Sequence, residues 1–155
     1  MKILGIDPAL GSLGWGVVEV QSPKIDYIHS DVIKTKPSTP MEQRLGFITS
    51  KLRGVVSLHQ PDIVAMEITF LNNNAASSLK LAYARGAIMS LVGELDIPYY
   101  EYAPNQIKKT IVGSGHADKH QVKTMVQMIL SGKMDEISFD EADALAVAYT
   151  CSANI

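Results

Sequence analysis

The order of apolar runs along the chain constrains its fold more than any other feature of the sequence. Three short strand-like runs come first, at residues 2–7, 15–20 and 25–35, with only short turns between them. Short connections join antiparallel neighbours, so these runs predict a three-stranded meander. Two more strand-like runs, at 63–67 and 97–101, each follow a helical pattern. Three antiparallel strands followed by strands joined through helices indicate an α/β protein.

The first long helix is expected to begin at Thr39-Pro40-Met41-Glu42. Thr39 can cap this helix, Pro40 suits its first position, and Glu42 can complete a capping box. Apolar residues then recur every three or four positions as far as about His59, which predicts one buried stripe. Pro61 is expected to end the helix.

The second long helix, from Asn74 to Leu95, has apolar residues on two opposite sides. The two stripes are Leu81, Ala84, Ile88, Leu91 and Leu95 on one side, and Leu79, Ala82, Gly86, Met89 and Gly93 on the other. A helix that is apolar on both sides must be buried on both sides. One side can cover the sheet. The other is buried either by a second subunit or by the rest of the same domain, and the sequence favours neither.

Three shorter helices are expected after the fifth strand, and their ends carry clear signals. Gly113 closes the first, which begins near residue 105. Asp118 caps the second, which ends near residue 132. Ser138 and Glu141 form a capping box that opens the last helix, which continues to the end of the chain.

Four carboxylates stand where these elements begin or end. Asp7 ends the first strand and Glu67 ends the fourth, whereas Asp140 and Asp143 lie one turn apart at the start of the last helix. Taken alone, Asp7 could organise a turn and Asp140 could stabilise a helix N-terminus. Burying unpaired carboxylates is costly, however, and converging oxygen ligands suit Mg²⁺ or Mn²⁺. Two such ions are the usual clamp for phosphodiester cleavage, so the acids together predict a metal-dependent nuclease.

The composition is compatible with this prediction. The chain has 155 residues, and we expect a single domain covering residues 1–155. The formal net charge of −2 is unusual for a nucleic-acid-binding protein, although bound metal would neutralise several acids. Cys151 is the only cysteine, which argues against a disulfide framework or a cysteine-based zinc site. With no long apolar run and no evident signal peptide, we expect a cytoplasmic protein.

The order of elements resembles the ribonuclease H-like fold of the retroviral integrase superfamily. In that fold a five-stranded mixed sheet, flanked by helices, brings the ends of the first and fourth strands together. The resemblance therefore implies that Asp7 and Glu67 are neighbours.

Longer stretches of the sequence resemble the RuvC family of Holliday-junction resolvases. The matching segments follow the family's order and cover essentially the whole chain. They are Gly5-Ile6-Asp7-Pro8, Gly14-Trp15-Gly16-Val17, Glu67-Ile68-Thr69-Phe70 leading to Asn74, Ser78-Leu79-Lys80-Leu81, Ala84-Arg85-Gly86, Gln106-Ile107-Lys108-Lys109, Val112-Gly113, then Gly115, Ala117, Lys119, Gln121 and Val122, and finally Asp140-Glu141-Ala142-Asp143-Ala144-Leu145-Ala146. Any one segment is a weak signal, whereas all of them in order are a strong one.

This resemblance implies a Mg²⁺-dependent endodeoxyribonuclease that resolves four-way DNA junctions by paired cuts during recombination and repair, with two ions in each active site. The residues that it implies as both catalytic and metal-binding are Asp7, Glu67, Asp140 and Asp143. Lys119 is implied as a further catalytic residue. The residues implied to contact DNA are Phe70, Asn74, Lys108 and Lys119. The resemblance also implies a homodimer formed through the helix at 74–95, and the branch-migration proteins RuvA and RuvB as partners.

Without the resemblance, some of these residues have simpler explanations. Lys108 and Lys119 could lie on a solvated helix surface, and Phe70 could pack in the core rather than stack on an unpaired base. Other functions are also compatible with parts of the sequence. They are a YqgF-like nuclease that acts on RNA, a non-catalytic junction-binding scaffold, and an actin- or sugar-kinase-like ATPase that uses the opening strand and hairpin as a phosphate loop.

Overall fold

The computed structural model of the chain describes residues 1–69 and 73–155. The strands are β1 (Lys2–Asp7), β2 (Ser12–Gln21), β3 (Lys24–Lys34), β4 (Ile63–Glu67) and β5 (Tyr99–Tyr102). The helices are α1 (Met41–His59), α2 (Ala75–Glu94), α3 (Pro104–Val112), α4 (Lys119–Ile129) and α5 (Phe139–Asn154). This is the order of elements that the sequence predicted.

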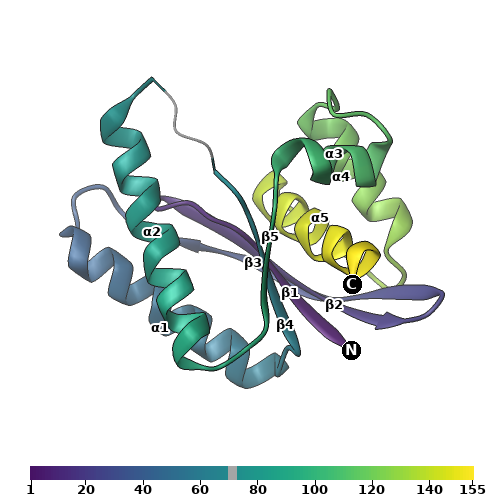
Figure 1. The fold of residues 1–155 in the computed structure, drawn as a ribbon, viewed down its shortest axis with the longest axis horizontal. Coiled ribbons are helices and arrows are strands. Elements are labelled where there is room, and N and C mark those ends of the chain that lie inside the picture. Colours follow the sequence, from purple (N-terminus) through teal and green to yellow (C-terminus); the bar gives the residue numbers. More distant parts are fainter. Residues whose placement is uncertain (70–72) are drawn as a thin grey trace.

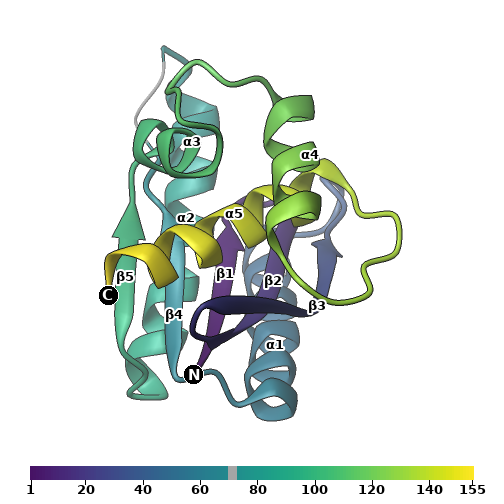
Figure 2. The same ribbon diagram turned by 90° about the vertical axis from the view of Figure 1, so that its right-hand side faces the viewer.

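The strands form one mixed sheet in the order β3-β2-β1-β4-β5. β1, β2 and β3 pair antiparallel, which confirms the predicted meander, whereas β4 pairs parallel to both β1 and β5. Helices α1 and α2 cover one face of the sheet, and α3, α4 and α5 cover the other (Figures 1 and 2). The sheet is therefore the middle layer of three, and it has a separate apolar core on each face.

Alternation along β1 shows how one strand serves both cores. Leu4 and Ile6 are buried on the face covered by α1 and α2. Ile3 is buried on the opposite face, against the group of residues that includes Leu145 of α5. Successive side chains of a strand point to opposite faces, so an uninterrupted apolar strand is what a sheet covered on both sides requires.

Glycines let α5 approach the sheet very closely. Gly5 of β1 pairs with Gly16 of β2, and Gly14 of β2 pairs with Asp7. A Cβ atom on Gly5 would overlap the carbonyl oxygen of Ala144, and one on Gly14 would overlap the carbonyl oxygen of Asp140. The absence of side chains at these positions is therefore what brings the first turns of α5 to the end of β1.

The start of α1 differs from the prediction. The helix begins at Met41, Pro40 occupies the N-cap position, and no side chain caps the helix. Pro40 contributes its carbonyl oxygen instead, which accepts hydrogen bonds from the backbone N–H groups of Gln43 and Arg44 at 3.1 and 3.0 Å. The predicted cap by Thr39 was wrong because Pro40 itself holds the extended conformation that a capping residue must adopt.

Helix α2 exposes the second of its two apolar sides. Ala84, Ile88 and Leu91 are buried against the sheet, as predicted. On the other side, Leu79 is 52% exposed and Met89 is 43% exposed. No other part of the described chain covers this side, so of the two alternatives that the sequence left open, burial by the rest of the same domain does not hold.

Candidate metal centre and active site

The parallel pairing of β1 with β4 places two acids together. Ile6 pairs with Met66, so Asp7 and Glu67 come next at the ends of adjacent strands. Both side chains are partly buried. The prediction that Asp7 and Glu67 lie next to each other is therefore confirmed, and it follows directly from the sheet register.

Helix α5 brings the other two acids to the same place. Carboxylate oxygens of Asp7, Asp140 and Asp143 all lie within 4.8 Å of one another. The capping box of Ser138 and Glu141 fixes the start of the helix, as the sequence predicted. Because Asp140 and Asp143 are three residues apart, they project from the same side of the first turns toward Asp7.

Burial and mutual repulsion change the acidity of this cluster. The pKa of Asp7 is raised to about 8, first by burial and then by the neighbouring charges of Asp143, Glu67 and Asp140, while Lys119 opposes the rise. The pKa of Asp143 is raised to about 6, mainly by burial and also by Asp140, while Lys119 and Lys108 oppose the rise. The pKa of Glu67 is raised by burial and by Asp143. A divalent cation would relieve both the burial cost and the repulsion, so the donor set fits a hard metal ion.

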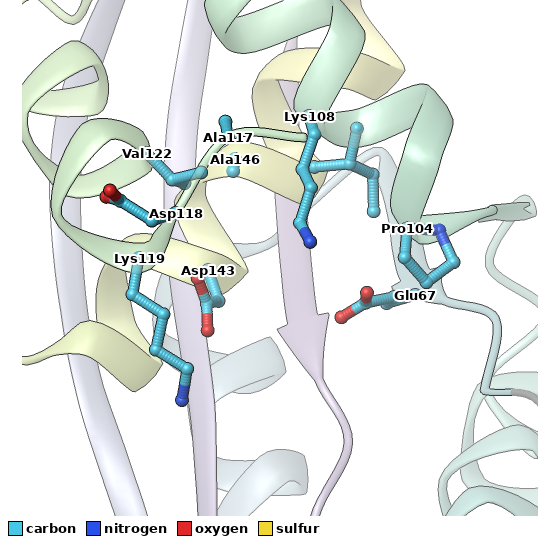
Figure 3. A pocket seen from close by; sticks show the side chains of 10 residues that line it. Glu67, Pro104, Lys108, Ala117, Asp118, Lys119, Val122, Asp143 and Ala146 are labelled. Atoms are coloured by element: carbon cyan, nitrogen blue, oxygen red, sulfur yellow. The ribbon is translucent and has the colours of Figure 1, made fainter. Parts of the chain in front are cut away.

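A hollow of about 400 Å³ opens beside the acids, and both predicted lysines line it. Glu67 and Asp143 stand on opposite sides of this hollow, with Lys108 of α3 pointing down between them (Figure 3). Lys119, the first residue of α4, extends past Asp143 (Figure 3). Lys119 is exposed and Lys108 is half-buried. The hollow thus combines carboxylates that can bind metal with ammonium groups that can bind phosphate.

Two residues that the sequence did not reveal hold the acids in position. The Ser12 hydroxyl donates a hydrogen bond of 2.8 Å to Oδ2 of Asp140. Arg85 of α2 donates from Nη1 to the backbone oxygen of Glu67, and its Nη2 pairs with Glu101 at 2.8 Å. Arg85 therefore ties the end of β4 to both α2 and β5. The signal that could have identified it is that Arg85 is the only charged residue between Lys80 and Glu94.

Phe70 and Asn74 are the other two residues predicted to contact DNA. Phe70 lies outside the described residues. Asn74 is the N-cap of α2, where its side-chain oxygen accepts a hydrogen bond of 3.1 Å from the backbone N–H of Ser77. Asn74 therefore has a structural function as a helix cap. Its side chain is also exposed, and its contact with DNA stays a prediction.

Two further features concern the reactivity of the cysteine and the length of the helices. Cys151 is a free and buried cysteine, and burial raises the pKa of its thiol, which keeps it in the unreactive protonated form. Across residues 1–69 and 73–155, every helix is too short or too polar to cross a membrane.

Comparison with known proteins identifies the family. The family model described as "Crossover junction endodeoxyribonuclease RuvC" matches residues 3–151. A RuvC from Rickettsia bellii (strain RML369-C) is 51% identical over 151 residues, which are 97% of this chain and 96% of that protein. Another, from Rickettsia felis, is 50% identical over 97% of each chain.

Solved structures agree with the sequence matches. Thermus thermophilus RuvC in complex with Holliday junction substrate superposes with a TM-score of 0.90 at 37% identity, covering 98% of this chain and 93% of that one. The yeast mitochondrial Holliday junction resolvase Ydc2 has a TM-score of 0.66 at 12% identity over 96% of this chain and 77% of its own, which supports the fold alone. The ribonuclease H-like fold predicted from the order of elements is thus confirmed. The chain belongs to the RuvC family of crossover junction endodeoxyribonucleases.

Proposed function

We propose that this chain is a structure-selective endonuclease that resolves four-way DNA junctions by metal-dependent phosphodiester hydrolysis during recombination and repair. The observation that carries the proposal is the convergence of Asp7, Asp140 and Asp143 within 4.8 Å, next to Glu67, in a member of this family. The complex of the Thermus thermophilus relative with Holliday junction substrate supports a junction as the substrate.

Two Mg²⁺ ions per active site fit this donor set, and Mn²⁺, which also prefers oxygen ligands, can replace them. The residues that would hold them are Asp7, Glu67, Asp140 and Asp143. When bound, such ions activate water and stabilise charge on the attacking and leaving oxygens. The protein contributes by holding the carboxylates in place, through the hydrogen bond from Ser12 to Asp140 and the contact of Arg85 with the Glu67 backbone.

The two lysines have different functions in this proposal. Lys119 is catalytic, because an ammonium group next to Asp143 can stabilise the charge that develops on the phosphate being cut. Lys108 binds a neighbouring phosphate, since it enters the same hollow from α3 (Figure 3). Asn74, at the start of α2, contacts the DNA backbone in this proposal.

Phe70 is proposed to stack on an unpaired base at the crossover. The basis of this proposal is that Phe70 follows Glu67 by only three residues in the sequence. Base-aromatic stacking contributes about 1–3 kcal/mol per base. Phe70→Ala should therefore impair cutting of a fully paired junction more than cutting of a junction with an unpaired centre. Lys119→Ala should slow both substrates equally, because it acts on charge and not on base opening.

A homodimer formed through α2 is also part of this proposal. The exposed apolar side of α2 includes Leu79 and Met89, and Gly86 between them has no atom within 4 Å of where a Cβ would lie. Helices approach closely where such small residues line the contact. A two-fold dimer would present two equivalent active sites, which suits paired cuts in a symmetric junction. The branch-migration proteins RuvA and RuvB are the proposed partners, and the cytoplasm is the proposed location.

The proposal is tested by comparing a four-way DNA junction with a linear duplex of the same sequence. Wild type should introduce paired nicks into the junction when Mg²⁺ is present, leave the duplex intact, and cut neither in EDTA. Asp7→Asn should abolish cutting but bind the junction at least as tightly, because a negative charge facing phosphate is removed. Asp135→Asn, at an exposed position of the loop before α5, is the matched control and should cut normally.

Four outcomes would contradict the proposal. Cutting in EDTA, or by Asp7→Asn at the wild-type rate, would refute the metal centre. Cutting of an RNA junction in preference to the DNA junction would favour the YqgF-like function. Tight junction binding by wild type without any cutting would favour the non-catalytic scaffold.

A further inference from the structure

A second basic surface lies away from α3 and α4, on the face of the sheet that α1 covers. It is a hollow of about 310 Å³ formed by the connection from β3 to α1 and the first turns of α1. The residues that line it are Lys34, Thr35, Lys36, Thr39, Gln43, Arg44 and Phe47. Three of these seven carry a positive charge and none carries a negative charge. The hollow is therefore suited to an anion.

Arg44 gives this hollow a fixed cation. Its residue exposure is only 6%, and its Nε donates a hydrogen bond of 2.8 Å to the hydroxyl of Thr35. That hydroxyl donates in turn to the backbone oxygen of Leu10 at 2.5 Å. In the part of the chain that the structure describes, Lys34, Lys36 and Arg44 take part in no ion pair. A buried guanidinium without a carboxylate partner favours a bound anion.

The local charge differs from that of the whole chain. Residues 34–51 contain four cations and a single acid, Glu42, which gives this segment a charge of +3. The complete chain has a formal net charge of −2. A positive segment in an otherwise acidic protein attracts a polyanion to one place on the surface.

The hollow adjoins the metal centre through the sheet. Lys34 pairs with Ser12 across β2 and β3, and Ser12 donates its hydrogen bond to Asp140. The backbone N–H of Thr35 donates to the oxygen of Gly11 at 3.0 Å, in the loop that follows Asp7. Lys108 and Lys119 lie with α3 and α4 on the opposite face of the sheet (Figures 1 and 2). The acids thus have basic groups on both sides.

We propose that the hollow of Lys34, Lys36 and Arg44 binds backbone phosphates of a junction arm that leaves the active site on the side of α1. This inference rests on the proposed function, because it takes the four acids as the place where the DNA is cut. Arginine and lysine that face phosphates position the DNA without reading its sequence. The contact therefore holds the arm in register with the metal centre and contributes to affinity for any sequence.

The test removes the two exposed lysines and leaves the buried arginine in place. The variant is Lys34→Gln with Lys36→Gln, and the control is Lys24→Gln with Lys133→Gln, which removes the same charge from exposed positions elsewhere. Junction affinity is measured in EDTA over a range of salt concentrations. Each lost phosphate contact lowers the slope of log K against log salt by about 0.9, which corresponds to about an eightfold loss of affinity at 0.1 M salt. The variant should lose about two units of slope, and the control should match wild type.

A second measurement locates the contact on the DNA. Single neutral methylphosphonate linkages are placed in turn along one arm. At one or two positions, the neutral linkage should weaken binding of wild type and of the control clearly more than binding of the double variant, which keeps only Arg44 in the hollow. Equal salt slopes for variant and control, or equal sensitivity of both at every linkage, would refute the hollow as a phosphate site.

The two proposals fail in different ways. If wild type cuts junctions with Mg²⁺ while variant and control bind alike, only the inference about the hollow is wrong. If wild type never cuts while the salt slopes differ as expected, the hollow binds DNA and the proposed catalytic function is wrong.

Discussion

Asp7→Asn should stabilise the metal-free protein, and the effect should depend on pH. The pKa of Asp7 is raised from 3.8 to about 8, first by burial and then by the charges of Asp143, Glu67 and Asp140. An acid with a higher pKa in the folded than in the unfolded state opposes folding once the pH exceeds the unfolded value. The penalty is therefore absent below pH 3.8 and grows until the pH reaches about 8. Asparagine has nearly the same shape and carries no such penalty.

The magnitude follows from the size of this shift. At pH 7 the pH lies 3.2 units above the unfolded pKa of 3.8, and each unit corresponds to about 1.36 kcal/mol, which gives an upper limit of about 4 kcal/mol. Asp143, whose pKa is raised to about 6, titrates together with Asp7, so the penalty is shared between the two carboxylates and is not carried by Asp7 alone. We therefore expect Asp7→Asn to raise the free energy of unfolding by about 2 kcal/mol at pH 7, about half of that limit.

The assay is urea unfolding in EDTA at pH 4, 7 and 8, repeated at pH 7 with excess Mg²⁺. The stabilisation by Asp7→Asn should be near zero at pH 4 and largest at pH 8. Excess Mg²⁺ should stabilise wild type, by about 2.7 kcal/mol at a hundred times the dissociation constant, and stabilise the variant less. The difference between the two proteins should then shrink or reverse.

The matched control is Asp135→Asn, because Asp135 is exposed. Surface substitutions of this kind change stability by less than about 0.5 kcal/mol. Equal stability of wild type and Asp7→Asn at pH 8 in EDTA would refute the reasoning. So would a stabilisation that is the same at pH 4 and pH 8, because it would show that the effect does not come from the charge.

Three further predictions concern the groups that surround the acids. Arg85→Lys should lower kcat at least tenfold, because Arg85 contacts the Glu67 backbone and Glu101, but it should leave junction affinity in EDTA within about threefold of wild type. The control Arg53→Lys, at a residue whose partner Glu94 is exposed, should change neither kcat nor affinity. Gly86→Glu should convert a dimer to a monomer in sedimentation equilibrium, whereas Gly54→Glu, at an equally open helical glycine of α1, should remain dimeric. A wild-type protein that is monomeric at micromolar concentration would contradict the dimer. Gly5→Ala should destabilise the fold by more than about 2 kcal/mol, since its Cβ would overlap the Ala144 carbonyl, whereas Gly54→Ala should stabilise α1 by about 0.5–1 kcal/mol. Unfolding free energies that rank the two variants the other way would contradict the close approach of α5 to the sheet.

The elements of this fold could be predicted because their signals are local. β4 has the bounds that the sequence predicted, and α4 begins at the capping box that Asp118 forms with Gln121. The N-terminus of α1 was predicted wrongly because two local signals compete there. Thr39 is a good capping residue, but Pro40 takes the capping position and leaves the helix to start at Met41. Element ends of this kind are decided by a single residue.

The acids could also be predicted, because each stands at the end of an element. Parallel pairing of β1 with β4 brings Asp7 next to Glu67, and the capping box at Ser138 indicates where α5 begins. The distances among Asp7, Asp140 and Asp143 could not be predicted, since they depend on how closely α5 approaches Gly5 and Gly14.

The contacts that support the acids could not be predicted from the sequence, although Arg85 is conspicuous there as the only charged residue between Lys80 and Glu94. Ser12 and Asp140 are 128 residues apart, and only the packing of α5 on β2 brings them together. Arg85 reaches Glu67 from a different layer of the structure. The basic hollow likewise forms because the turn after β3 folds against α1, which places Arg44 next to Thr35. Contacts of this kind depend on tertiary packing and leave no periodic pattern in the sequence.

The central claim is that Asp7, Glu67, Asp140 and Asp143 form a two-metal site. The most direct measurement is anomalous scattering from crystals grown with Mn²⁺. We expect two ions about 3.5–4 Å apart, coordinated by these four carboxylates. In crystals of Asp7→Asn, at least one of the two ions should be lost. Ions bound only at other surfaces, or the same two ions in the absence of the Asp7 carboxylate, would contradict the account.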